Sequence, residues 1–274
     1  DFYQVDPMPL FRKEFTAKKK ISTARLYISA LGYYEAYLNG QKIGDQVLDP
    51  GWTSYNKQIL YAVHDVTKMI REGVNVTGIM VGNGWYNALP LRFWGSINMR
   101  NALVTGRPCV KAQLRIQYKD GTSEVLTTDD SWQTLSGPIV RNNVYLGEHY
   151  DARLEQNGWK ETAGTNLKGI KNAIEVPGPS GEMAAQMQPP IRVTKIVKPI
   201  SIKETKPGVF IFDMGQNFAG VAKISVQGAV GTHIVLRYGE DVYADGSLNV
   251  MTSVTGQIKG GQGGPGAPQV AWQE

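Results

Sequence analysis

The chain has 274 residues, enough for one large or two ordinary domains, and its 42% hydrophobic content excludes wholesale disorder. Its 31 glycines and 14 prolines are too few for a collagen-like polymer but enough for a turn-rich fold. The formal net charge of +5 is scattered along the sequence, and the one basic run, Lys18–Lys20, is typical of a solvated turn, so nucleic acid is excluded as a partner.

The sequence also limits the membrane and redox chemistry of the protein. No apolar run approaches the ~18 residues needed to cross a bilayer, so no membrane partner is expected. The single cysteine, Cys109, excludes an internal disulfide framework and a zinc knuckle. The start at Asp1, without a leader, predicts a processed mature end or an excised piece. We expect a periplasmic or secreted location, and a cytoplasmic one stays open.

The dominant hydrophobic period is two. Asn39-Gly40 is the dipeptide of a type I′ turn, and Lys119-Asp120-Gly121 predicts a hairpin into Ser123–Thr128. Helix evidence is limited to Thr67–Glu72, little more than a turn. The sequence therefore predicts an all-β protein. Its clearest strands are Phe11–Phe15, Ala24–Ala30, Val110–Tyr118 and Val221–Val226.

Proline-rich sequence near residues 176–190 predicts a domain boundary, because few contacts cross such connections. We place one domain at residues 1–180 and a second at 181–274. The glycine-rich stretch Gly260–Pro268 is typical of a mobile loop or linker.

Aromatic residues gather between residues 52 and 94, interleaved with carboxylates and amides. A flat ring can bury the apolar face of a sugar while polar groups pair with its hydroxyls, although the same aromatic residues also fill sandwich cores. Two glycines around Asn83 predict a special turn at a strand end. The candidate carbohydrate-binding residues are Asp49, Trp52, Asn83, Trp85 and Tyr86.

Other polar groupings favour structural roles. The run Gly147–Arg153 holds two acids, a histidine and an arginine, and we interpret it as a structural acid–arginine pair rather than a catalytic site. Asp45 with Asp49, or Asp129 with Asp130, could offer oxygens to calcium, but neither follows EF-hand spacing, so the metal ligands stay unknown. No other cofactor is required, and no catalytic residue is nominated.

Several motifs occur in an order that resembles bacterial α-L-rhamnosidases. The first group resembles their amino-terminal domain and the second the β-sandwich that follows it. The motifs are Tyr37-Leu38-Asn39-Gly40, Leu48-Asp49-Pro50-Gly51-Trp52, Asp65-Val66-Thr67, Gly82-Asn83-Gly84-Trp85-Tyr86, Gly147-Glu148 with Tyr150-Asp151-Ala152-Arg153 and Gly158-Trp159, and then Phe212 to Gly220, Arg237-Tyr238-Gly239-Glu240 and Asp245-Gly246.

The resemblance implies two jelly-roll-like, galactose-binding-like β-sandwiches in tandem, placed before an (α/α)₆ barrel that carries the catalytic carboxylates. The parent enzyme would release terminal non-reducing α-L-rhamnose with inversion, which needs two carboxyl groups about 6.5–9.5 Å apart. We expect this chain to lack that barrel and to be inactive alone. The second sandwich is expected to be incomplete at its carboxyl end, because a Phe-X-Tyr-His-Gly-Phe-Arg strand is missing, which would expose a sheet edge.

Three function classes stay open at this point. The chain is a carbohydrate-recognising part of a rhamnosidase, with L-rhamnose-containing carbohydrate, calcium and a downstream barrel as implied partners. Alternatively, it is a structural support for that barrel without a ligand, or a stand-alone carbohydrate-binding or adhesion protein, because β-sandwiches serve all three purposes.

Overall fold

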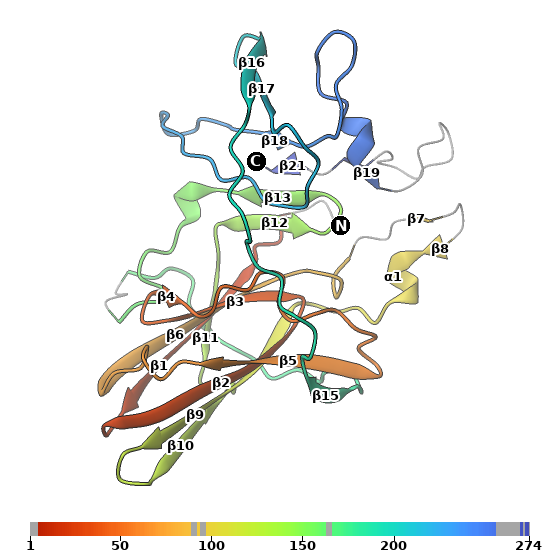
Figure 1. Cartoon of the computed structure of the whole chain (residues 1–274). Coiled ribbons are helices and arrows are strands. Elements are labelled where there is room, and N and C mark those ends of the chain that lie inside the picture. The colour runs from red at the N-terminus through yellow and green to blue at the C-terminus, as the bar shows by residue number, and fades with distance from the viewer. Residues whose placement is uncertain are drawn as a thin grey trace.

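The computed structural model of the protein describes residues 5–88, 92–93, 97–162, 166–255, 269–270 and 272–273. Nearly all regular structure in these ranges is β-strand (Figure 1). The helical elements of the described residues are short: α1 (Met99–Ala102) and the 3₁₀ turns η1 (Ala152–Leu154) and η2 (Val250–Ser253). The predicted all-β class is confirmed. No helix among the described residues is both long and apolar enough to cross a membrane.

Two facing sheets form a β-sandwich in the lower half of Figure 1. Leu26, Ile28, Ile79 and Ile116 belong to the buried cluster between them. The six-stranded sheet has the order β14 (Lys171–Asn172), β11 (Gln133–Ser136), β1 (Pro9–Ala17), β6 (Gly73–Gly82), β3 (Tyr33–Leu38) and β4 (Gln41–Lys42). The five-stranded sheet has the order β10 (Ser123–Thr127), β9 (Cys109–Tyr118), β2 (Ile21–Leu31), β5 (Gln58–Asp65) and β15 (Glu182–Ala185).

Period-two patterning explains these strands, because alternate side chains enter the core while their neighbours face solvent. In β9, for example, Ala112, Leu114 and Ile116 are buried and Arg115 is exposed. Three of the four predicted strands are confirmed: Phe11–Phe15 lies in β1, Ala24–Ala30 in β2 and Val110–Tyr118 in β9.

The predicted turns also form. Asn39 and Gly40 both have positive φ, at 52° and 85°, as a type I′ turn between β3 and β4 requires. The hairpin from β9 into β10 is confirmed, with Gly121 at a φ of 86°. Lys18–Lys20 connects β1 to β2 as a short solvated link, as predicted.

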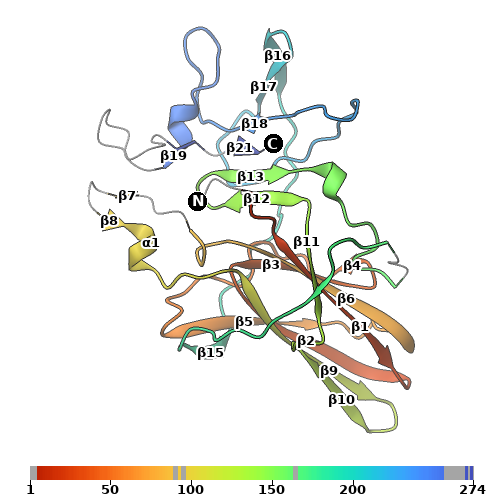
Figure 2. The same ribbon diagram turned by 180° about the vertical axis from the view of Figure 1, so that it is seen from behind.

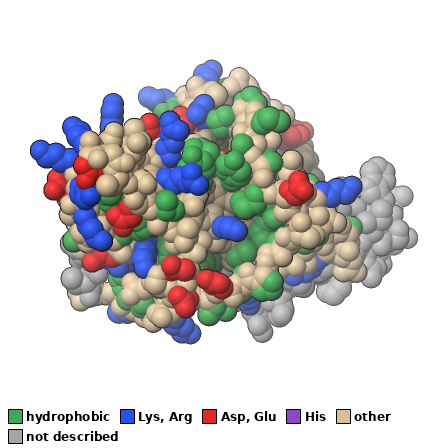
Figure 3. Space-filling view, turned by 90° about the horizontal axis from the view of Figure 1, so that it is seen from below, with side chains coloured by type: hydrophobic (Ala, Val, Ile, Leu, Met, Phe, Trp, Pro, Cys, Tyr) green, Lys and Arg blue, Asp and Glu red, His purple; other side chains and the backbone are tan. Residues whose placement is uncertain are grey.

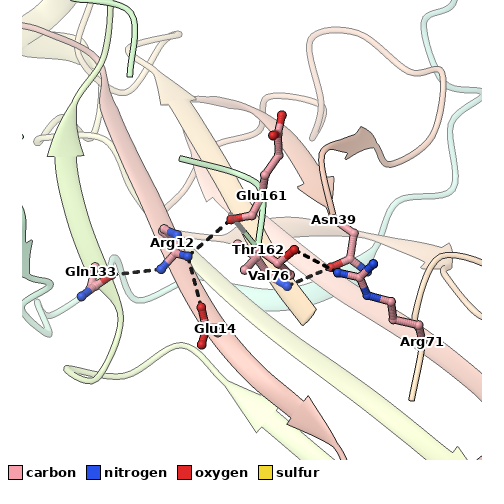
Figure 4. A network of polar contacts seen from close by, with 8 residues as sticks. All are labelled: Arg12, Glu14, Asn39, Arg71, Val76, Gln133, Glu161 and Thr162. Carbon is pink, nitrogen blue, oxygen red and sulfur yellow. Dashed lines mark hydrogen bonds and ion pairs between the residues drawn. The ribbon is translucent and has the colours of Figure 1, made fainter. Parts of the chain in front are cut away.

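The segment after η1 covers the outer face of the six-stranded sheet. Trp159 is buried against Gly78, where an added Cβ would lie 2.6 Å from the indole. Nearby, the buried Arg12 donates to the Gln133 amide oxygen at 3.3 Å and to the backbone oxygen of Glu161 at 3.5 Å (Figure 4). These contacts hold the segment after η1 against β1 and β11.

A third sheet joins the middle of the chain to its late part, above the sandwich in Figures 1 and 2. Its order is β12 (Ile139–Asn143), β13 (Gly147–Tyr150), β21 (Trp272–Gln273) and β18 (Leu236–Arg237). Three two-stranded sheets are β16 (Ser201–Lys206) with β17 (Val209–Asp213), β7 (Arg92–Phe93) with β8 (Ile97–Asn98), and β19 (Val254–Thr255) with β20 (Gln269–Val270). The division at residue 180 stays a prediction; β15, just beyond it, pairs with β5.

The predicted strand Val221–Val226 is wrong, because this segment has no regular structure. Alternation stabilises a strand only when a neighbouring strand pairs with its backbone and a second layer covers its apolar side. Here Val221, Ile224 and Val226 are all exposed. The predicted mobile stretch Gly260–Pro268 lies outside the described residues.

Candidate functional site

Two of the five candidate residues form an aromatic pair at the surface. The Trp52 and Trp85 rings stack with centroids 4.9 Å apart and planes 23° apart. Trp52 is 40% exposed and Trp85 is half-buried. The Trp85 ring is in turn held edge-on by the buried Tyr145, with centroids 5.5 Å apart. Trp85 therefore packs against one face of Trp52, whose apolar ring stays partly exposed at the surface.

Hydrogen bonds among three asparagine residues fix the loop that carries Trp85. The Asn83 backbone N–H and side-chain amide both donate to Asn142, each at 2.7 Å, and Asn87 donates to the Asn83 side-chain oxygen at 2.9 Å. Gly84 has a φ of 48°, and an added Cβ would lie 2.9 Å from the Gly32 Cα. The special turn predicted around Asn83 is confirmed, but the Asn83 side chain is already committed to internal bonds.

Asp49 lies inside the protein, with only 3% of its surface exposed. Its carboxylate accepts from the Tyr34 hydroxyl at 3.2 Å and from the Gln186 side-chain amide at 3.0 Å. The Tyr34 hydroxyl also lies 2.9 Å from Nε2 of the buried His64. Burial lowers the pKa of His64, and the charge of Asp49 offsets part of that effect. This cluster links β3, β5 and the chain after β15, which is a structural role.

Tyr86 is a core residue. It is 8% exposed and belongs to a cluster with Leu31, Tyr55 and Ile59, with its ring edge-on to Tyr55 at 5.6 Å. The structure thus brings Trp52 and Trp85 together at the surface and turns Asp49, Asn83 and Tyr86 inward. Sequence reasoning missed Tyr145, because it lies in the turn between β12 and β13, 60 positions from Trp85, and no local pattern connects the two.

Two carboxylates, Glu35 and Glu148, interact electrostatically. Burial raises the pKa of Glu148, and the charge of Glu35 adds to the increase. Burial opposes ionisation of Glu35, but hydrogen bonds from Lys42 and Tyr37 outweigh it and lower its pKa. The cavity beside Glu35 has a volume of about 10 Å³, room for one water and not for a sugar. Glu148 does not line this cavity, so the cavity does not join the two carboxylates into one site.

The remaining polar candidates form ordinary surface pairs. The acid–arginine pair predicted in Gly147–Arg153 is confirmed: Arg153 donates to both oxygens of Asp151, at 2.8 and 2.6 Å. Asp45 pairs with Arg192 at 2.6 Å. Among the described residues, no group of three or more His, Cys, Asp or Glu side chains could hold a metal ion. Because both Asp49 oxygens and the Asp45 carboxylate are already bonded, these residues do not fit a ready calcium cage.

Family models match most of the chain. Residues 19–195 match the α-L-rhamnosidase N-terminal domain, and residues 203–261 match the bacterial α-L-rhamnosidase concanavalin-like domain. The chain belongs to the bacterial α-L-rhamnosidase family. It is 40% identical over 236 residues to an α-L-rhamnosidase of Streptomyces avermitilis and 34% identical over 273 residues to one of Formosa agariphila. These alignments cover 84% and 96% of this chain.

Solved α-L-rhamnosidases share the fold. The α-L-rhamnosidase from Dictyoglumus thermophilum matches with a TM-score of 0.83 and 37% identity, over 98% of this chain and 28% of that one. The Streptomyces avermitilis enzyme, solved in complex with L-rhamnose, matches with a TM-score of 0.81 and 34% identity over 98% of this chain and 26% of that one. The chain spans about a quarter of the length of these relatives.

Proposed function

We propose that the chain is a non-catalytic, carbohydrate-recognising part of an α-L-rhamnosidase, and that Trp52 and Trp85 form its sugar platform. The observation that carries this proposal is the stacked indole pair at the surface, because an exposed, oriented ring in a folded protein suits the apolar face of a pyranose. The ligand class follows from the family and from the relative solved with L-rhamnose. Trp52 contacts the sugar, and Trp85 positions Trp52.

Calorimetric titration of L-rhamnose tests this platform. Trp52→Ala is expected to weaken binding about tenfold or more, a loss of about 1.4 kcal/mol, and Trp85→Ala to weaken it by releasing Trp52. Trp52→Phe should retain part of the affinity. Phe210→Ala, which removes another exposed aromatic ring, from β17, is the matched control and should bind normally. No heat from the wild type at millimolar sugar refutes the carbohydrate-binding role.

Calcium does not enter this proposal as a structural requirement, because the Asp49 and Asp45 carboxylates already have partners within the protein. Adding calcium or a chelator is therefore expected to leave the rhamnose titration unchanged. A calcium-dependent affinity would show that ligands outside these residues complete a metal site.

The catalytic part of the proposal concerns the parent enzyme. We propose that the parent removes terminal non-reducing α-L-rhamnose by inversion and that its carboxylates lie in a downstream barrel. Support comes from the family match and from the strand-rich fold of the described residues. An assay of this chain on an aryl α-L-rhamnoside should show no turnover beside an active full-length enzyme. Turnover by this chain alone would place the reaction centre within it.

A supporting role for the second half of the chain has its own evidence. Ile196, Ile202, Phe212 and Val230 are exposed, although such side chains are usually buried. We propose that these side chains pack against further sequence of the parent enzyme, which completes the predicted second sandwich. Solution scattering should then show self-association of the chain that increases with concentration. A compact monomer at every concentration counts against it. A periplasmic or secreted location remains part of the same proposal.

A further inference from the structure

The outer face of the five-stranded sheet carries a second surface of distinctive chemistry. This sheet lies at the bottom of the molecule in Figure 1, and Figure 3 looks onto that side, where hydrophobic side chains near the middle are bordered by Lys and Arg together with several Asp and Glu. Strand alternation turns Arg25 and Tyr27 of β2, Arg115 of β9 and Tyr61 of β5 away from the core. We call these four residues the tyrosine–arginine face.

Two like charges lie directly opposite each other on this face. Arg25 of β2 pairs in register with Arg115 of β9, and both side chains are exposed. Like charges in directly opposed positions of an antiparallel pair are destabilising. Lys111, four pairs along the same ladder and paired with Ser29, adds a third exposed cation on the same side. The opposed cations therefore lower the stability of the sheet.

Acidic neighbours compensate for only part of this charge. Asp65 lies opposite Arg25 on β5, but its Oδ1 accepts from the Thr67 backbone N–H at 2.9 Å. Hydrogen bonds from Thr67 lower the pKa of Asp65 most, and the charge of Arg25 contributes less. Arg115 donates through Nε to the neutral side chain of Gln113 at 3.2 Å. The face therefore retains a positive charge.

The aromatic side chains give the same face an apolar strip. The Tyr27 and Tyr61 rings lie 6.3 Å apart, centroid to centroid, with an angle of 51° between their planes. The Arg115 guanidinium lies 5.6 Å from the centre of the Tyr27 ring, within the range of a cation–π contact. Exposed Val63 and Val125 continue the strip on the adjoining strands.

We propose that the tyrosine–arginine face binds an anionic polysaccharide whose sugars carry carboxylates. A guanidinium pairs with a planar carboxylate through two parallel hydrogen bonds, and a tyrosine ring covers the C–H face of a sugar. The bound carboxylates would relieve the repulsion between Arg25 and Arg115. The charge of the face is what selects an acidic chain over a neutral one.

The test uses polygalacturonate as the probe and its fully methyl-esterified form as the neutral counterpart. Arg115→Gln removes one of the opposed charges, so we expect its thermal midpoint to equal or exceed that of the wild type while binding to polygalacturonate falls at least tenfold. Lys203→Gln makes the same charge change on an exposed position of β16 and should bind like the wild type. Tyr27→Ala should weaken binding with every charge retained.

Three results would overturn the proposal. Equal loss in Lys203→Gln and Arg115→Gln would show attraction to net charge alone. Equal binding of the methyl ester would show that carboxylates are not recognised. Unchanged binding by Arg115→Gln would remove the face from recognition altogether. Dextran sulfate, run beside polygalacturonate, separates sulfate from carboxylate as the anionic group, and tighter binding of the sulfate would overturn the choice of carboxylate.

Discussion

Replacing Asp49 with alanine separates a structural role from a ligand-binding one. We expect the free energy of unfolding to fall by about 3 to 5 kcal/mol, while the folded variant binds L-rhamnose as the wild type does. A hydrogen bond to a charged group contributes about 1.5 to 3 kcal/mol, and the Asp49 carboxylate accepts two. Losing the Tyr34 hydrogen bond should cost close to the lower of these two values, because the Tyr34 hydroxyl still has His64 as a partner. The Gln186 amide, in contrast, loses its acceptor.

Urea unfolding and thermal unfolding measure this loss. Each 1 kcal/mol lowers the midpoint of a chain of this size by roughly 2 to 4 °C, so a fall of about 6 to 20 °C is expected. Asp45→Ala is the matched control: it removes a carboxylate whose side chain is 71% exposed and paired with Arg192, and should cost less than about 1 kcal/mol. An Asp49→Ala variant as stable as Asp45→Ala that fails to bind rhamnose would refute the reasoning and return Asp49 to the ligand site.

Three further predictions concern stability. Burial lowers the pKa of His64 in the folded state, so the unfolded chain takes up the proton first as the pH falls. Urea unfolding should therefore show the free energy of unfolding falling as pH drops below about 6.5. The same pH series on His64→Asn should show a smaller dependence of that free energy on pH. Glu148 has a raised pKa, so its contribution is present at low pH and lost as pH rises through that value; Glu148→Gln should therefore unfold at higher urea than the wild type at pH 7 but not at pH 4. Gly78→Ala forces a methyl group against Trp159 and should cost about 1 to 3 kcal/mol in urea unfolding, whereas in Gly121→Ala the methyl meets no atom within 4 Å and any loss reflects the positive φ alone.

Local chemistry explains which parts of the fold the sequence predicts. The turn at Asn39-Gly40 follows from two residues that tolerate positive φ, and the strand at Val110–Tyr118 from an alternation that both of its neighbours match. The alternation at Val221–Val226 looks similar but finds neither a pairing strand nor a covering layer, so it produces no strand. Periodicity reports what a segment can bury, whereas a strand also needs a partner from elsewhere in the chain.

The candidate site was predictable in composition but not in geometry. The aromatic cluster and its glycines mark the region, because both are visible within a few residues of Trp85. The direction of each side chain depends on distant partners: Asp49 is bonded by Gln186, 137 positions away, and Asn83 by Asn142, 59 positions away. A sequence pattern contains no information on such pairings, so it cannot separate a ligand-facing amide from one that fixes a loop.

A physical criterion that separates the two roles is whether a polar side chain already has hydrogen-bond partners within the protein. Asp49 and Asn83 have partners for their polar atoms within the protein, so their presence is explained by stability without a ligand. Trp52 exposes an indole that water solvates poorly, and Arg25 faces Arg115 across a ladder at a cost to the sheet. Proteins retain such locally unfavourable features chiefly where a function depends on them, which is why we expect carbohydrate to bind on these two surfaces.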